Sequence, residues 1–190
     1  MRVGLYFGSF NPVHNGHLII ANHIANETNL DQVWLVVSPQ NPFKQSVSLL
    51  NEYQRLHLIK SAIDGEKKLR ASNVEFNLPK PSYTVDTLAY LNEKFPEYEF
   101  SIVMGSDGFQ NLPNWKNYEV IIANHPIYIY KRPGFEITEN WGANIKIMNA
   151  PLLDISSTHI RKLIKEKKSI RFLVPDLVKE EIEQAGYYKN

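Results

Sequence analysis

The sequence predicts an α/β fold: a single, doubly wound and mainly parallel sheet with helices on both faces. Short apolar runs of strand length alternate along most of the chain with segments that carry apolar residues at helical spacing. Runs of this kind are typical of strands that are buried on both faces of a sheet. The alternation favours parallel strands joined by crossover helices, which is the arrangement of Rossmann-like folds.

Each element follows from a local pattern. The expected strands are short apolar runs: Val3–Phe7, Gln32–Val37, Leu69–Phe76, Phe100–Met104, Ile127–Tyr130 and Ile145–Met148. The expected helices are Leu18–Ala25, Asn51–Ile63, Thr84–Lys94, Trp115–Ala123, a helix from Ser156 or Ser157 to Ile164, and a last helix from Pro175 to near Gly186. Ser82 is expected to cap the third helix, and Pro175 to occupy the first turn of the last one.

Length and composition fit one ordinary globular domain. The chain has 190 residues, so we expect one domain over 1–190, whose C-terminal helical part begins near residue 156. A net charge of +1 gives no electrostatic reason to expect nucleic acid or a membrane surface as partner. The absence of cysteine excludes a disulfide scaffold, a thiolate nucleophile and a cysteine zinc site. No signal peptide or membrane-length apolar stretch is recognisable, so we expect a cytoplasmic enzyme.

Four polar clusters are expected to meet at one edge of the sheet. Gly8–His17, Ser38–Lys44 and Gly105–Asp107 each follow an expected strand, and Ser156–Arg161 opens a helix. In a doubly wound parallel sheet, ligands bind outside the carboxyl ends of the strands, where the strand order reverses. The four clusters can therefore converge on a single crevice.

The most informative cluster, Gly8–His17, joins the first strand to the first helix. A glycine-bearing turn in this place presents backbone N–H groups and a helix dipole to a phosphate, and Gly16 allows the backbone to approach it closely. His14 and His17 can donate hydrogen bonds to phosphate oxygens and stabilise developing charge. The alternative, in which His14 caps a turn and His17 merely begins a helix, does not account for the pair, the glycine and the context together. No metal site is expected, because a third ligand is lacking.

The second cluster places three hydroxyl residues, Ser156, Ser157 and Thr158, at the start of a helix, within one turn of Arg161. Side-chain and backbone donors at a helix start suit an anion, and the guanidinium group adds a permanently charged fork for a polyphosphate. The alternative is an ordinary serine cap beside a surface arginine. The sequence by itself leaves both interpretations open.

Other candidates lie in segments that border the expected crevice. Asp107 can accept hydrogen bonds from ribose hydroxyls or simply cap the turn after its strand. Trp115 can stack on a flat ring or belong to the core. Tyr83 and Thr84 offer hydroxyls and free N–H groups at a helix start, which suit a carboxylate or a phosphate. Lys44 is a single cation on a loop, where such a residue is usually solvated surface.

Together these motifs resemble those of the HxGH-class nucleotidyltransferases, and among them the bacterial nicotinate-nucleotide adenylyltransferase family. The segments that carry the resemblance are Gly8–His17, Pro81–Leu88 (PSYTxDTL in the family), Gly105–Asp107 with Leu112–Trp115 (GSD…LPxW), Ile155–Arg161 (ISSTxIR) and Arg171–Pro175. The Pro81–Leu88 and Leu112–Trp115 segments are what narrow the resemblance to the nicotinate branch. Two positions depart from the family pattern: Asn11 stands where aspartate is common, and Phe43 where a histidine precedes the lysine.

The resemblance implies an enzyme that transfers AMP from ATP to nicotinate mononucleotide. In this family the mononucleotide phosphate attacks the α-phosphorus directly, so that pyrophosphate leaves without a covalent intermediate. The implied cofactor is Mg²⁺ carried by ATP, since no carboxylate cage for the ion is evident in the sequence. The implied partners are ATP and nicotinate mononucleotide, and a homo-oligomer is left open as an alternative to a monomer.

The resemblance also implies roles for single residues. The implied catalytic residues are His14, His17 and Arg161, with His17 stabilising the transition state. The implied ATP-binding residues are Gly8, Ser9, Phe10, His14, Gly16, His17, Gly105, Asp107, Ser156, Ser157, Thr158 and Arg161. The implied mononucleotide site comprises Lys44, Tyr83, Thr84 and Trp115, with the indole stacked on the pyridine ring and the N–H groups at Tyr83 and Thr84 facing the nicotinate carboxylate.

Alternative functions differ in the motifs that they need. A transferase of the same class that uses nicotinamide mononucleotide, phosphopantetheine or a cytidylyl donor would share the first and ISSTxIR motifs without needing the middle segments. A non-catalytic nucleotide sensor would keep the glycines but lose His17 or Arg161, and both are present. A tRNA-binding module is disfavoured because the chain is short, nearly neutral and without a second basic domain.

Overall fold

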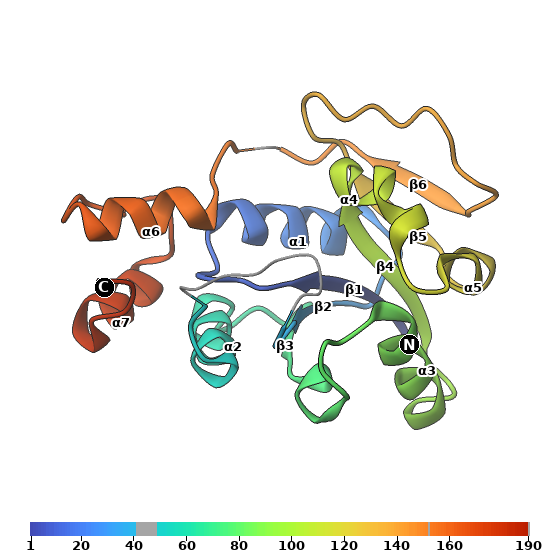
Figure 1. Ribbon diagram of the computed structural model, residues 1–190, viewed down its shortest axis with the longest axis horizontal. Helices are drawn as coiled ribbons and strands as arrows, with labels where there is room; N and C mark the ends of the chain where they lie inside the picture. Colours follow the sequence, from blue (N-terminus) through green and yellow to red (C-terminus); the bar gives the residue numbers. More distant parts are fainter. Residues whose placement is uncertain (41–48, 152, 190) are drawn as a thin grey trace.

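The computed structural model describes residues 1–40, 49–151 and 153–189, and it confirms the predicted α/β class (Figure 1). A single sheet has its six strands, all parallel, in the order β3–β2–β1–β4–β5–β6. The strands are β1 (Arg2–Gly8), β2 (Gln32–Val37), β3 (Leu69–Ser72), β4 (Glu99–Gly105), β5 (Ile127–Tyr130) and β6 (Ile145–Met148). The helices are α1 (Asn15–Glu27), α2 (Glu52–Ala62), α3 (Thr84–Lys94), α4 (Ser106–Gln110), α5 (Tyr118–Asn124), α6 (Ser157–Lys165) and α7 (Asp176–Ala185), with 3₁₀ turns η1 (Val74–Asn77) and η2 (Leu112–Asn114).

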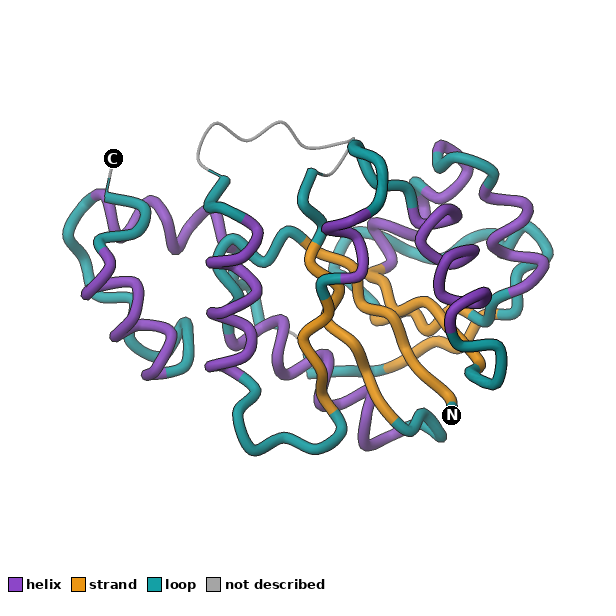
Figure 2. Tube along the Cα trace, turned by 90° about the horizontal axis from the view of Figure 1, so that it is seen from below, coloured by secondary structure: helices purple, strands orange, loops and turns teal. Residues whose placement is uncertain are grey.

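The strands divide their side chains between two apolar cores, one on each face of the sheet. On β1, Leu5 lies in one core and Tyr6 in the other, and β5 repeats this alternation with Ile129 and Tyr130. Helices α1, α2, α6 and α7 pack on the face of Tyr6, whereas α3, α4 and α5 pack on the opposite face (Figure 2). Because both faces are buried, the strands need apolar residues at nearly every position, which is why they appear in the sequence as continuous runs.

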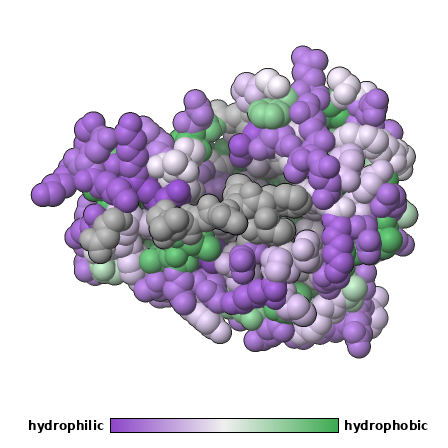
Figure 3. Space-filling view, viewed as in Figure 1, coloured by the Kyte–Doolittle hydropathy of each residue, from purple (hydrophilic) through white to green (hydrophobic). Residues whose placement is uncertain are grey.

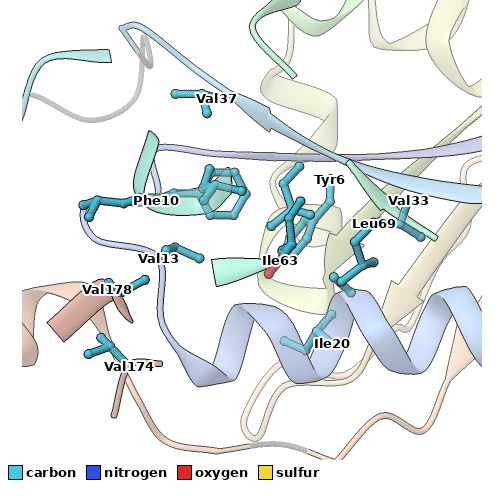
Figure 4. Packing of buried hydrophobic residues seen from close by; sticks show 14 of the residues in the cluster. Tyr6, Phe10, Val13, Ile20, Val33, Val37, Ile63, Leu69, Val174 and Val178 are labelled. Carbon is cyan, nitrogen blue, oxygen red and sulfur yellow. The ribbon is translucent and has the colours of Figure 1, made fainter. Parts of the chain in front are cut away.

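The turn that follows β1 is buried between the sheet and the C-terminal helices. Figure 4 shows Phe10 and Val13 from this turn beside Val174 and Val178 from the segment that enters α7. All four side chains are at most 2% exposed. Residues near the two ends of the chain therefore share one core.

The surface is mostly polar. In Figure 3, hydrophilic residues gather over α6 and α7 at one end of the molecule, and apolar residues form only small scattered patches on the face shown. Within the part of the chain that the structure describes, no helix is long and apolar enough to cross a membrane.

The strand order reverses at β1, whose neighbours are β2 on one side and β4 on the other. In doubly wound sheets, ligands bind outside the carboxyl ends of the strands at this point. Here those ends are Gly8 on β1 and Gly105 on β4. The fold thus predicts a crevice beside the polar clusters Gly8–His17 and Gly105–Asp107.

Two expectations about the segment before α3 are wrong. The strand expected over Leu69–Phe76 ends at Ser72, because the chain turns into η1 and brings the carboxyl group of Glu75 into the interior. Ser82 does not cap α3: the N-cap is Tyr83, and the hydroxyl of Ser82 instead donates to Glu75. The buried carboxyl group of Glu75 is thus the common element in both differences between the structure and the local sequence pattern.

Other boundaries also differ from the expected ones. The helix expected over Trp115–Ala123 begins only at Tyr118, because Asn117 has the left-handed φ of 50°. The short helix α4 directly after β4 was not expected at all. Pro175 is the N-cap of α7 and does not lie in its first turn.

Candidate active site

Two cavities open at the carboxyl ends of the strands and share part of their walls. The larger one, of about 390 Å³, is lined by the turn after β1, the start of α4 and the start of α6. The smaller one, of about 120 Å³, is lined by the start of α3 and by η1. Three residues line both cavities: Phe7, Gly8 and Trp115. A ligand that bridges the two cavities would therefore pass the end of β1.

The predicted site residues gather at these cavities with two exceptions. The larger cavity is lined by Gly8, Ser9, Phe10, His14, His17, Gly105, Asp107, Ser156, Ser157, Thr158 and Arg161. The smaller cavity is lined by Tyr83 and Thr84, and Trp115 lies at the junction. Gly16 lines neither cavity, and Lys44 lies outside the described residues, together with Phe43.

His14 and His17 form a stacked pair on the floor of the larger cavity. Their ring centroids are 3.7 Å apart and their planes differ by 25°. Burial, and secondly the charge of Arg132, lower the pKa of His14 to about 4, so this ring is neutral at neutral pH. A Cβ atom at Gly16 would lie 3.1 Å from Nδ1 of His14, so the glycine makes room for the imidazole. Close approach of the backbone to a phosphate is not what this structure shows for Gly16.

The start of α6 forms the opposite wall of the larger cavity. Ser156 caps the helix, since its Oγ accepts a hydrogen bond from the backbone N–H of His159 at 3.2 Å. Ser157 Oγ donates to a backbone carbonyl of the turn after β1, that of Pro12, at 2.9 Å. Because this hydroxyl proton is used within the protein, Ser157 can offer an anion its backbone N–H. Arg161 donates to Thr158 Oγ1 at 3.3 Å, which turns the guanidinium group toward the helix start.

The turn after β1 is held by residues that are distant in sequence. Arg161 donates from Nη1 to the carbonyl of Asn11 at 2.7 Å. The Oδ1 atom of Asn11 accepts from the hydroxyl of Tyr188 at 2.9 Å and from the N–H of Leu50 at 3.1 Å. The Asn11 side chain therefore serves as an acceptor inside the protein. An amide oxygen supplies that acceptor as an aspartate at this position would, so the departure from the family pattern does not break the arrangement.

A second arginine supports the same turn from behind. Arg55, which is fully buried, donates to four backbone carbonyls: those of Ser9 at 2.6 Å, Leu50 at 2.8 Å, Ser38 at 2.9 Å and Pro39 at 3.3 Å. Burial lowers the pKa of Arg55, although a guanidinium group keeps its charge in proteins. The arginine thus ties the end of β1 to the end of β2.

Arg132 is a site residue that sequence reasoning missed. It follows β5, lines the larger cavity, and its Nε lies 3.4 Å from Oδ1 of Asp107. Its Nη2 donates to the Tyr130 hydroxyl at 3.4 Å, and that hydroxyl lies 3.3 Å from the hydroxyl of Tyr6. The run Lys131-Arg132-Pro133-Gly134 directly after an expected strand was the available signal. Together with Arg161, this guanidinium group gives the larger cavity cations on two sides.

The smaller cavity combines an aromatic wall with a helix start. Tyr83 is the N-cap of α3 and Thr84 its first residue, so the first N–H groups of the helix have no intrahelical acceptor. Trp115 is half-buried rather than part of the core. The ammonium group of Lys116 lies 4.9 Å from the centre of the Tyr83 ring and pairs with Asp86 at 2.8 Å. Such a cavity suits a flat ring that bears an anionic substituent.

A buried carboxyl group also lines the smaller cavity. Glu75 accepts hydrogen bonds from Ser82 Oγ at 2.7 Å and from Thr87 Oγ1 at 2.9 Å. Burial raises the pKa of Glu75, and the hydroxyls of Ser82, Thr87 and Ser38 lower it in part. Sequence reasoning missed this residue because it is flanked by Val74 and Phe76 in what was expected to be a strand. Among the described residues, no cluster of three or more His, Cys, Asp or Glu side chains could hold a metal ion.

The chain is similar to proteins of a known family and to solved structures. Residues 5–163 match the family model described as Cytidylyltransferase-like. A probable nicotinate-nucleotide adenylyltransferase of Flavobacterium psychrophilum is 52% identical over the full length of both chains, and one of Cytophaga hutchinsonii is 50% identical, also over the full length of both. The chain belongs to the nicotinate-nucleotide adenylyltransferase family. A solved structure of a relative, the Plasmodium falciparum nicotinic acid mononucleotide adenylyltransferase complexed with NaAD, has a TM-score of 0.84 and is 23% identical, covering 98% of this chain and 97% of that one. At that identity the likeness supports the fold.

Proposed function

We propose that the protein transfers AMP from ATP to nicotinate mononucleotide, forming deamido-NAD and pyrophosphate. The observation that carries this proposal is the pair of joined cavities. One is lined by two imidazoles, two guanidinium groups and the starts of α1, α4 and α6, and the other by an indole and the start of α3. Their shared wall at Gly8 is where the phosphates of the two substrates would meet.

The proposed chemical step needs positioning and charge stabilisation rather than a protein nucleophile. An oxygen of the mononucleotide 5′-phosphate forms a bond to the α-phosphorus of ATP, while the bond from that phosphorus to the bridging oxygen breaks and pyrophosphate leaves with the electron pair. His14, His17 and Arg161 are the proposed catalytic residues. The two imidazoles and the guanidinium group donate hydrogen bonds to phosphoryl oxygens as negative charge develops on them.

ATP is proposed to occupy the larger cavity. The start of α6 and Arg161 are placed to bind the β- and γ-phosphates, through backbone N–H groups and the guanidinium fork. Asp107 accepts hydrogen bonds from the ribose hydroxyls in this arrangement, and its pairing with Arg132 holds the carboxylate at the cavity wall. Mg²⁺ is proposed to enter bound to the triphosphate.

Nicotinate mononucleotide is proposed to place its pyridine ring in the smaller cavity. Trp115 stacks on the ring, and the N–H groups at the start of α3 bind the carboxylate next to Tyr83 and Thr84. Lys44, which lies outside the described residues, is proposed to assist in binding the mononucleotide. A cytoplasmic location stays a prediction, and a homo-oligomer stays an open alternative.

The experiment that tests this function is pyrophosphate release from Mg-ATP with nicotinate mononucleotide and nicotinamide mononucleotide in parallel assays. We expect release with the acid, a smaller rate with the amide, and loss of release when Mg²⁺ is chelated. Release with neither mononucleotide would overturn the proposed acceptor, and phosphopantetheine would be the next acceptor to assay.

A further inference from the structure

The smaller cavity contains a conflict of charge. The proposed function places the carboxylate of the mononucleotide at the start of α3, yet the carboxyl group of Glu75 lines the same cavity of about 120 Å³. Glu75 is only 2% exposed, so water screens it poorly. Two carboxylates confined in this way disfavour each other's ionised form.

The groups around Glu75 are neutral. Its carboxyl oxygens are bonded by the hydroxyls of Ser82, Thr87 and Ser38, and no basic side chain in the described part of the chain forms an ion pair with it. When Glu75 is ionised, no basic side chain paired with it offsets its repulsion of a second anion in the cavity.

Charged groups do face this region from the surrounding elements, but they are engaged elsewhere. Asp86 on α3 and Lys116 before α5 pair with each other. On α2, Arg55 donates to the carbonyl of Ser38, and Lys116 and Tyr83 are the other titratable side chains that line the cavity within the described residues. Among the three, Glu75 is the buried one, and it lines the cavity in which the carboxylate is proposed to bind.

The same carboxyl group also sets the geometry of that site. Ser82 precedes α3 and Thr87 lies in its first turns, and both donate to Glu75. The Thr87 hydroxyl also lies 3.3 Å from the carbonyl oxygen of Tyr83, so the same proton has two acceptors within reach. A change in the charge of Glu75 therefore changes the hydrogen bonds at the start of α3, where the substituent of the pyridine ring would bind.

We propose that Glu75 is a specificity-determining residue that is protonated when the acid-form mononucleotide is bound and ionised when the amide form is bound. The inference rests on the proposed function. An ionised Glu75 repels a carboxylate and favours the positive N–H₂ end of a carboxamide, and protonation removes both effects. The complex with the acid consequently holds one proton more at Glu75 than the complex with the amide.

The test is the ratio of kcat/KM for the acid to kcat/KM for the amide, measured across neutral and mildly alkaline pH. Titration of ATP and of the 5′-phosphate cancels in this ratio, because both reactions share them. We expect the ratio to fall as pH rises, with a limiting slope of about tenfold per pH unit, since the two complexes differ by one proton. A ratio that does not change with pH overturns the proposal.

Two variants locate the responsible group. Glu75→Gln keeps the size of the side chain but cannot ionise, so the ratio should become independent of pH. Asp86→Asn is the matched control. It removes an exposed carboxylate from the start of α3, the helix whose start contacts Glu75, and should leave the slope of the ratio in place. A slope that persists in Glu75→Gln, or that disappears in Asp86→Asn alone, overturns the assignment to Glu75.

Calorimetry of the unmodified protein covers the case in which Glu75→Gln fails to fold. The heats of binding of each mononucleotide are compared in buffers with different ionisation enthalpies. Binding of the acid is expected to take up about one proton more than binding of the amide, and equal uptake with both overturns the proposal. If neither mononucleotide releases pyrophosphate, the proposed function itself fails, whereas activity with a pH-independent ratio refutes only the role of Glu75.

Discussion

Arg55 and Glu75 are two buried ionisable side chains, one basic and one acidic, and each supports one of the two cavities. Arg55 donates to four backbone carbonyls behind the turn after β1, and Glu75 accepts from hydroxyls behind the start of α3. Neither forms an ion pair with another described residue. Ser38 joins them, since its carbonyl accepts from Arg55 while its hydroxyl bonds to Glu75.

The difference between the two lies in the charge that each leaves at its cavity. An ion pair largely cancels its own field at a distance, whereas neutral ligands stabilise a buried charge without cancelling it. The turn after β1 therefore has a positive group behind it, which suits anions. The smaller cavity has a group behind it that can be negative, so its preference for an acid or an amide depends on a proton.

The largest effect on the phosphate side is expected from His17→Ala. This change removes a donor that would stabilise developing phosphoryl charge, so kcat should fall by about 10²-fold or more. Steady-state pyrophosphate release checks this, with circular dichroism to confirm the fold. His159→Ala is a suitable control, because that histidine is exposed on α6 and does not line the cavity. Turnover of His17→Ala within a few-fold of the unmodified protein would contradict its role.

Removing the buried cation should cost stability. Arg55→Met leaves four carbonyls without their donor, and we expect the free energy of unfolding to fall by about 3 kcal/mol. Urea titration measures it, with Lys60→Met on the exposed face of the same helix as control, for which a change within about 0.5 kcal/mol is expected. Equal values for the two variants would show that Arg55 does not support the turn.

On the pyridine side, Trp115→Ala should act mainly on binding. Loss of stacking should raise the KM for the mononucleotide about tenfold, which corresponds to roughly 1.4 kcal/mol, and change the KM for ATP less. Trp115→Phe keeps an aromatic ring and should recover part of the affinity. An unchanged mononucleotide KM in the alanine variant would mean that the indole only packs against the neighbouring core.

The smallest effect is expected from Tyr188→Phe. It deletes the hydroxyl that donates to Asn11, and a single hydrogen bond of this kind contributes about 1 kcal/mol to unfolding stability. Tyr187→Phe, at the adjacent and less buried position, is the matched control and should be nearly neutral. If both variants unfold alike, the contact with Asn11 contributes nothing measurable to stability.

The sequence predicted most of the fold because its signals are local. Apolar runs marked the strands, and contiguous motifs marked the turn after β1 and the start of α6. The parts that it did not predict depend on contacts between distant positions: Arg55 reaches Ser9 across 46 positions, and Tyr188 reaches Asn11 across 177. No local pattern records such pairs.

At Glu75 a local pattern was present, but it predicted the wrong structure. Its apolar neighbours indicated a strand, but the hydroxyls of Ser82 and Thr87 draw its carboxyl group inward and the chain forms η1 instead. Local preference was overridden by the need of a buried acid for donors. The residue that broke the strand prediction is also the one on which substrate preference is proposed to depend.

The bond between Asn11 and Tyr188 also has a consequence for the order of events during protein synthesis. The turn after β1 is translated before the other five strands, whereas its hydroxyl partner is translated after all six. A nascent chain that has not yet reached residue 188 contains every strand of the sheet and still lacks this hydrogen bond to the turn after β1. The support that Tyr188 gives to this turn can therefore form only after all six strands have been synthesised.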